Sequence, residues 1–133
     1  MGLFDLFLGK PVYKKRTVSY KGRKFNVEVA DSFRKIAIGL MNHTNLPKNA
    51  GMLFIFSRPG RYGFWMLHMK FKIDIIWLDE SGRVVHMWEN AEPSNSMFSS
   101  RTVTPNKDAL YVLEFNAGTA ARLKIKAGSR FAI

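Results

Sequence analysis

Apolar residues occupy every odd-numbered position from 65 to 77, which predicts a strand with one buried face. These positions are Trp65, Leu67, Met69, Phe71, Ile73, Ile75 and Trp77. Because successive side chains of a strand point to opposite faces, this period of two favours one strand, or two strands joined by a bend near residues 70–72. The even positions put His68, Lys70, Lys72 and Asp74 on the other face. The apolar residues do not recur at helical spacing.

Further strands are predicted from alternation and from turn residues. Residues 12–20 and 24–30 flank Tyr20-Lys21-Gly22-Arg23, which predicts a β-hairpin. A second hairpin turns at Asp79-Glu80-Ser81-Gly82, where glycine suits the left-handed position. Other strands are predicted at residues 52–56, 111–115 and 129–132, with a turn at 57–60, a loop at 42–50 and a long connection at 90–108.

Two short helices complete the predicted pattern. The first begins at Asp31 or Ser32 and runs to about residue 40, with Phe33, Ile36, Ala37 and Leu40 on its buried face. The second covers residues 117–123. We therefore expect an α+β, β-dominated fold, a small antiparallel barrel-like or sandwich sheet whose open end the two helices cover.

The length of 133 residues suits one hydrophobic core, so residues 1–133 are expected to form a single domain. The chain contains no cysteine, which excludes disulfides and thiolate chemistry and suits a reducing compartment. The apolar segment 1–10 lacks the basic start and cleavage site of a signal peptide and is too short to span a bilayer. A cytoplasmic location is therefore expected.

The net charge of +11 is concentrated toward the N-terminus. The candidate residues for binding nucleic acid or an anionic surface are Lys14, Lys15, Arg16, Lys21, Arg23 and Lys24. The apolar residues within 3–8 could add a peripheral membrane contact or pack on the core of the same domain. A plain solvated basic surface is the favoured explanation of the charge.

Several short blocks, in order and at characteristic spacing, resemble an uncharacterised family, domain of unknown function 192, also called uncharacterised protein family 0127. They are GLM at 39–41, GMLF at 51–54, FWM at 64–66, IDII at 73–76, GRVV at 82–85, YVLE at 111–114 and AGTA at 117–120. The resemblance covers residues 24–133 and implies a small β-rich domain with no established activity. The chain departs from the family's usual Lys-Asn-Thr run after FWM, where it has Leu67, His68 and Met69, and His43 replaces a common arginine.

Asp74 lies among isoleucines, which is an unusual environment for a carboxylate. It either binds a ligand in a pocket or has a structural role, paired with Lys70 or Lys72 or with backbone N–H groups. The ligand-binding candidates are Trp65, Met66, His68, Asp74 and His43. The leading hypothesis is a noncatalytic binding module for a small polar or carbohydrate-like ligand, with Trp65 stacking on the ligand.

Two alternatives to this binding module remain open. One is nucleic-acid or anionic-surface binding through the basic residues. Another is an enzyme that uses Asp74 and His68 as an acid–base pair. The sequence contains no GxSxG, HExxH or phosphate-binding glycine motif, so we expect no cofactor and no metal, although His43, His68 and His86 would suit zinc if they converged. The oligomeric state is not predicted.

Overall fold

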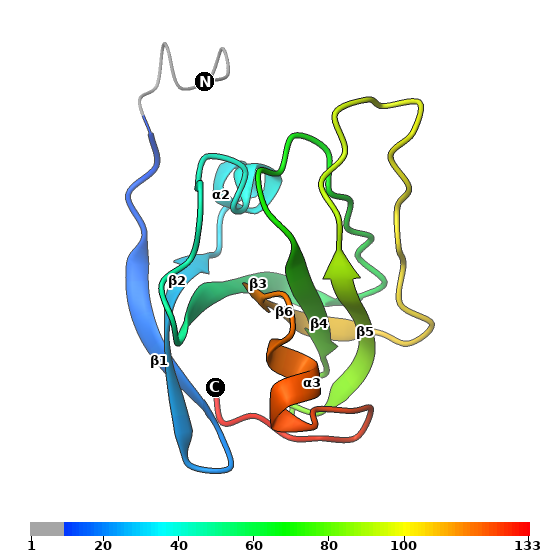
Figure 1. Ribbon diagram of the computed structural model, residues 1–133. Coiled ribbons are helices and arrows are strands. Elements are labelled where there is room, and N and C mark those ends of the chain that lie inside the picture. The colour runs from blue at the N-terminus through cyan, green and yellow to red at the C-terminus, as the bar shows by residue number, and fades with distance from the viewer. Residues whose placement is uncertain (1–9) are drawn as a thin grey trace.

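The computed structural model describes residues 10–133, which form one six-stranded sheet and two short helices (Figure 1). The elements in chain order are β1 (Lys14–Tyr20), β2 (Arg23–Ala30), α2 (Phe33–Ile38), β3 (Ala50–Gly60), β4 (Ile73–Leu78), β5 (Val84–Ala91), β6 (Ala109–Asn116) and α3 (Thr119–Leu123). The strand order is β1-β2-β3-β6-β4-β5, and every neighbouring pair is antiparallel except β2 and β3. The predicted β-dominated α+β fold is confirmed.

The sheet curves around α3 but does not close into a barrel, so this part of the prediction is wrong (Figure 1). Within residues 10–133, no ladder joins the edge strands β1 and β5. The C-terminal segment connects them instead. Ser19 and Ala132 exchange two backbone hydrogen bonds of 2.9 Å, and the amide of Phe131 donates to the carbonyl of Gly82 at 2.9 Å. Residues 129–132 therefore contribute isolated bridges to both edges of the sheet, and not a full strand.

Local chemistry explains the hairpin between β4 and β5 and the start of α2. In the turn between β4 and β5, Asp79 Oδ1 accepts hydrogen bonds from the amides of Ser81 and Arg83 at 2.9 and 3.0 Å. Gly82 has φ +85°, and a Cβ atom there would lie 2.4 Å from a backbone oxygen of the C-terminal segment. Ser32 caps α2, because its Oγ accepts a hydrogen bond from the Lys35 amide at 3.3 Å. These local predictions are confirmed.

Three local predictions are wrong. Residues 57–60 continue β3, with an irregularity in its pairing with β6, and do not form a turn. In the predicted strand of residues 64–78, only Ile73–Leu78 is a strand, and Trp65 is 43% exposed. Phe33, predicted on the buried face of α2, is 92% exposed. A helix of six residues has too few turns to bury a full apolar stripe.

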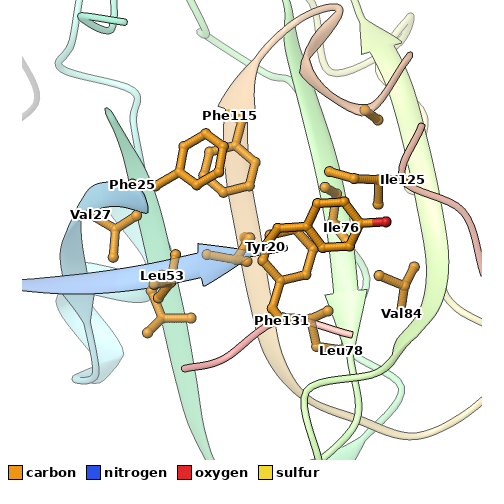
Figure 2. Close-up of a cluster of buried hydrophobic side chains, with 13 residues drawn as sticks. Tyr20, Phe25, Val27, Leu53, Ile76, Leu78, Val84, Phe115, Ile125 and Phe131 are labelled. Atoms are coloured by element: carbon orange, nitrogen blue, oxygen red, sulfur yellow. The ribbon is translucent and has the colours of Figure 1, made fainter. Parts of the chain in front are cut away.

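The central strands β3, β6 and β4 bury side chains on both faces, which divides the core into two clusters. One cluster includes Leu53, Ile76 and Leu113 and packs against α3 and Phe131. Figure 2 shows part of it, with the rings of Phe25 and Phe115 in contact and Tyr20 beside Phe131. The other cluster, on the opposite face, includes Met52, Phe54 and Trp77 and packs beneath the end of α2. Burial on both faces makes these strands continuous apolar runs with few polar positions.

Candidate functional site

An apolar pocket of about 300 Å³ lies between α2 and the second core cluster. We call it the Glu114 pocket. Its lining comes from α2 and the turn after it, from β3, from the irregular segment 62–69, and from one residue of β6. The lining residues are Ile36, Ala37, Ile38, Gly39, Leu40, Met41, Phe54, Phe56, Tyr62, Gly63, Phe64, Trp65, Leu67, Met69 and Glu114. The volume and apolar character are typical of a small-molecule site.

The aromatic walls of the pocket are held by contacts with one another. The rings of Phe56 and Tyr62 stack with centroids 3.7 Å apart, and Phe54 meets Phe64 edge to face at 5.0 Å. Tyr62 is fixed at two further points. Its hydroxyl donates to the carbonyl of Arg58 at 2.6 Å, and its own carbonyl accepts from Trp77 Nε1 at 2.8 Å. The walls therefore have a defined shape without a ligand.

Glu114 brings a carboxyl group into this apolar setting. The residue lies on the central strand β6 opposite Met52 of β3 and Ile75 of β4, and it is 4% exposed. Its Oε1 atom is buried and has no hydrogen-bond partner among the described residues. Burial raises the pKa of Glu114 to about 8, because the apolar surroundings disfavour the charged form. At neutral pH the group is therefore mostly a neutral carboxylic acid.

An unpartnered buried carboxyl is costly to the fold. Leaving a buried polar atom without a hydrogen bond costs about 1–3 kcal/mol, so such groups are rare in folded proteins. Gly39, on the turn after α2, packs close to this group, since a Cβ atom there would lie 3.3 Å from the Phe54 ring and 3.9 Å from Glu114 Oε1. The carboxyl can donate a hydrogen bond while neutral, or accept hydrogen bonds and pair with a cation once ionised.

Asp74 also lies in a buried strand, but unlike Glu114 it has hydrogen-bond partners for both carboxylate oxygens. Its neighbour Ile75 belongs to the second core cluster, which lies on the α2 side of the sheet. Because successive side chains of a strand point to opposite faces, Asp74 points to the α3 side, where it is 1% exposed. Its Oδ1 accepts a hydrogen bond from the amide of Asn90, and its Oδ2 accepts one from the amide of Ala120 in α3, both at 2.9 Å. Asp74 thus links β4 to β5 and to the start of α3. This is the structural role that the sequence left open.

The predicted ligand-binding residues do not meet in one place. Trp65 lines the Glu114 pocket, whereas Asp74 lies on the other face of the sheet. Met66 is buried and borders a separate groove beside the 92–101 loop. His68 is an exposed loop residue with φ +62°. The predicted Asp74 and His68 acid–base pair is therefore not assembled, because Asp74 is buried and bonded to two backbone amides, whereas His68 is exposed in a loop.

His43 lines a separate pocket, together with Tyr13, Glu28 and Asn42. Its Nε2 lies 2.6 Å from Glu28 Oε1, and both side chains are 25% exposed.

Within residues 10–133, no group of three or more His, Cys, Asp or Glu side chains lies close enough to hold a metal ion. In the same range, no helix is long and apolar enough to cross a membrane.

The sequence indicates that Glu114 is buried, although the alternation of polar and apolar residues does not show this. Like Asp74, it is a carboxylate inside a run of apolar residues, ALYVLEF at 109–115. Such a run is typical of a strand buried on both faces, so a carboxylate within it must be buried too. Only the tertiary structure shows that the two carboxylates point to opposite faces and that just one of them has donors.

The predicted basic residues are exposed on β1, β2 and the turn between them. They are Lys14, Lys15, Arg16, Lys21, Arg23 and Lys24. Two of them, Arg16 and Lys21, line a groove that also contains Arg130 and Glu80. The predicted membrane contact at residues 3–8 lies outside the described part of the chain.

Comparison with known proteins places the chain among proteins whose function is unknown. A UPF0127 protein from Pyrococcus abyssi is 30% identical over 130 residues, which cover 92% of this chain and 96% of that one. A UPF0127 protein from Thermococcus kodakarensis is 32% identical over 114 residues, which cover 81% of this chain and 66% of that one.

Two solved structures share the fold. A protein of unknown function from Novosphingobium aromaticivorans is 31% identical with a TM-score of 0.77, and the match covers 91% of this chain and 85% of that one. A proposed transcription regulator from Sinorhizobium meliloti is 28% identical with a TM-score of 0.81, covering 92% and 96%. The family described as uncharacterized ACR, domain of unknown function 192, matches residues 15–133. The resemblance seen in the sequence is therefore confirmed, and the chain belongs to this uncharacterised family.

Proposed function

We propose that this protein is a noncatalytic binding module that holds a small organic ligand in the Glu114 pocket. The observation that carries the proposal is the buried carboxyl of Glu114, whose Oε1 atom has no partner among the described residues and lies within an aromatic-lined cavity. A ligand with a complementary polar group would supply the missing hydrogen bond. Trp65, which lines the same pocket and is 43% exposed, would cover the ligand at the solvent side.

The chemistry of the lining supports binding over catalysis. Among the described lining residues, Tyr62 is the only ionisable side chain besides Glu114. The Tyr62 hydroxyl is already engaged with the carbonyl of Arg58. General acid–base catalysis and nucleophilic catalysis both need a second positioned group beside the carboxyl. The lining presents one polar group surrounded by apolar surface, which suits recognition.

The test is a thermal-shift screen with sugars, nucleosides, amines and aromatic acids, repeated on two matched variants. Trp65→Ala removes a ring from the pocket, whereas Trp88→Ala removes a ring that lies outside it, beside Arg101. A compound that raises the melting temperature of the wild type and of Trp88→Ala, but not of Trp65→Ala, supports the proposal. If no compound stabilises the wild type, or if the Trp65→Ala variant responds fully, the pocket is not the binding site.

A second candidate function is nucleic-acid binding, and one specific observation favours it. Arg16 and Lys21 of the first hairpin share a groove with Arg130 of the C-terminal segment, which gathers three cations from distant parts of the chain. The protein from Sinorhizobium meliloti described as a proposed transcription regulator has the same fold. Such binding should weaken steeply with salt, in proportion to the phosphates neutralised. Fluorescence anisotropy with a short DNA duplex tests it, with Arg16→Glu and Glu114→Gln as the sensitive and insensitive variants.

A further inference from the structure

We infer that the ligand of the Glu114 pocket is an organic cation, a small molecule with an apolar or aromatic body and one ammonium or guanidinium group. The cationic group pairs with the carboxylate of Glu114, and the body packs between α2 and the aromatic walls. This inference rests on the proposed binding function and specifies its ligand class.

The described pocket lining supplies no cationic hydrogen-bond donor to Glu114. Its Oε1 atom is buried without a donor, and no cationic side chain is among the described lining residues. Lys70, whose Nζ donates to the carbonyl of Met41 at 3.1 Å, is not part of the lining. The donor that completes this site must therefore come from the ligand. An ammonium or guanidinium group carries several donors and a charge that opposes the carboxylate.

The aromatic walls of the pocket also favour a cationic ligand. Phe54, Phe56, Tyr62, Phe64 and Trp65 all contribute to the lining. The faces of aromatic rings attract cations, and this attraction strengthens when water is excluded. An anionic ligand would meet a carboxyl and the negative ring faces, and the lining side chains would offer it the Trp65 indole N–H and the Glu114 proton but no cation.

The same lining argues against a sugar. A carbohydrate buries many hydroxyl groups, and each of them needs a partner. The side chains of this pocket offer one carboxyl, the indole N–H of Trp65, and one tyrosine hydroxyl that is already bonded to the carbonyl of Arg58. A ligand with a single polar group and an apolar body fits this set of partners, whereas a carbohydrate-like ligand does not.

Cation binding must change the protonation of Glu114. Burial raises the pKa of Glu114 to about 8, so the carboxyl of the ligand-free pocket is mostly neutral at pH 7. When the ammonium binds, the carboxyl becomes ionised and its proton leaves for the buffer, so that charge is balanced in the pocket. Tyr62 is the only other ionisable group in the lining, and Asp74 faces the opposite side of the sheet. Close to one proton should therefore be released per cation bound.

The experiment uses three probes that share a phenyl ring and differ in charge: phenethylamine, 2-phenylethanol and phenylacetate. Each is titrated at pH 7 into the wild type, Glu114→Gln, Trp65→Ala and the exposed control Glu80→Gln. Backbone amide NMR gives the dissociation constants, locates binding through residues such as Gly39 and Gly63, and shows that each variant is folded. Calorimetry of phenethylamine binding in two buffers of different ionisation enthalpy gives the number of protons released.

We expect phenethylamine to bind the wild type and Glu80→Gln alike, and to bind Glu114→Gln about 10- to 100-fold more weakly, since a charge-assisted hydrogen bond is lost. Proton release should disappear in Glu114→Gln. If 2-phenylethanol or phenylacetate binds as tightly as phenethylamine and Trp65→Ala weakens it, the cation inference is wrong and the binding function stands. If none of the three probes shifts the pocket amides of the wild type, the cation inference is overturned, and the thermal-shift screen then decides separately on the binding function.

Discussion

Replacing Glu114 with glutamine should change how the stability of the fold depends on pH. Glutamine has nearly the same shape as a protonated glutamate and cannot ionise. The wild-type carboxyl is fully buried, and burial raises its pKa from 4.5 to about 8. The variant therefore removes one titration from the folded state and leaves the packing of the strand in place.

The sign follows from proton binding in the two states. Between about pH 4.5 and pH 8 the folded wild type holds a proton on Glu114 that the unfolded chain has released. The free energy of unfolding therefore falls as the pH rises through this window, and the contribution of the neutral carboxyl is complete only below pH 4.5. The slope approaches about 1.4 kcal/mol per pH unit, which gives roughly 2–3 kcal/mol between pH 5 and pH 7. Glutamine has no such slope.

Urea denaturation at half-unit intervals from pH 5 to pH 8.5 measures this difference. The Glu114→Gln variant should gain stability relative to the wild type as the pH rises, and Glu80→Gln, which changes an exposed carboxylate in the turn between β4 and β5, should follow the wild type. If Glu114→Gln and the wild type keep a constant difference over the whole range, Glu114 is ionised in the folded protein. The argument that its carboxyl lacks a partner would then be refuted.

Two further substitutions test the roles assigned to buried groups. Asp74→Ala leaves the buried amide of Ala120 and the part-buried amide of Asn90 without an acceptor and should lower the free energy of unfolding by about 2–4 kcal/mol in urea titrations; a loss below about 1 kcal/mol would contradict the structural role. Phe131→Ala removes a ring that is 2% exposed and packs 5.0 Å from the Tyr20 ring, so a loss of about 3–5 kcal/mol is expected in the same assay, and a near-wild-type midpoint would mean that the C-terminal segment does not hold the sheet edges together.

Sequence patterns were sufficient where the cause of the structure is local. The hairpin between β1 and β2, the turn at Asp79 and the Ser32 cap all depend on residues within a few positions of one another. The parallel pairing of β2 with β3 and the placement of β6 between β3 and β4 depend on long-range packing, which alternation does not encode. The same limit explains why Trp65, predicted on a buried face, is 43% exposed. The chain leaves the strand path before Ile73, so the period of two no longer decides which side chain is buried.

For the candidate site, the sequence pointed to Trp65 and Asp74, whereas the carboxyl that shares a pocket with Trp65 is that of Glu114. Trp65 was predicted and lines the pocket, but it was paired with Asp74 because both lie in one continuous stretch. Residues from β3, β6 and the turn after α2 complete the pocket. No spacing rule joins positions as distant as Gly39, Trp65 and Glu114, so the site exists only at the level of the tertiary structure.

Asp74 and Glu114 together show what separates a structural carboxylate from a candidate binding group. Both lie on central strands and are nearly inaccessible to water, and both are flanked by apolar residues in the sequence. Asp74 accepts two backbone hydrogen bonds, one of them from α3, so its burial is compensated within the chain. Glu114 lacks a partner for Oε1 among the described residues and remains protonated at neutral pH, which costs stability that the fold does not recover. Substitution by a hydrophobic residue would relieve that cost, and under the proposed binding function a ligand from outside the chain would supply the partner that Glu114 lacks.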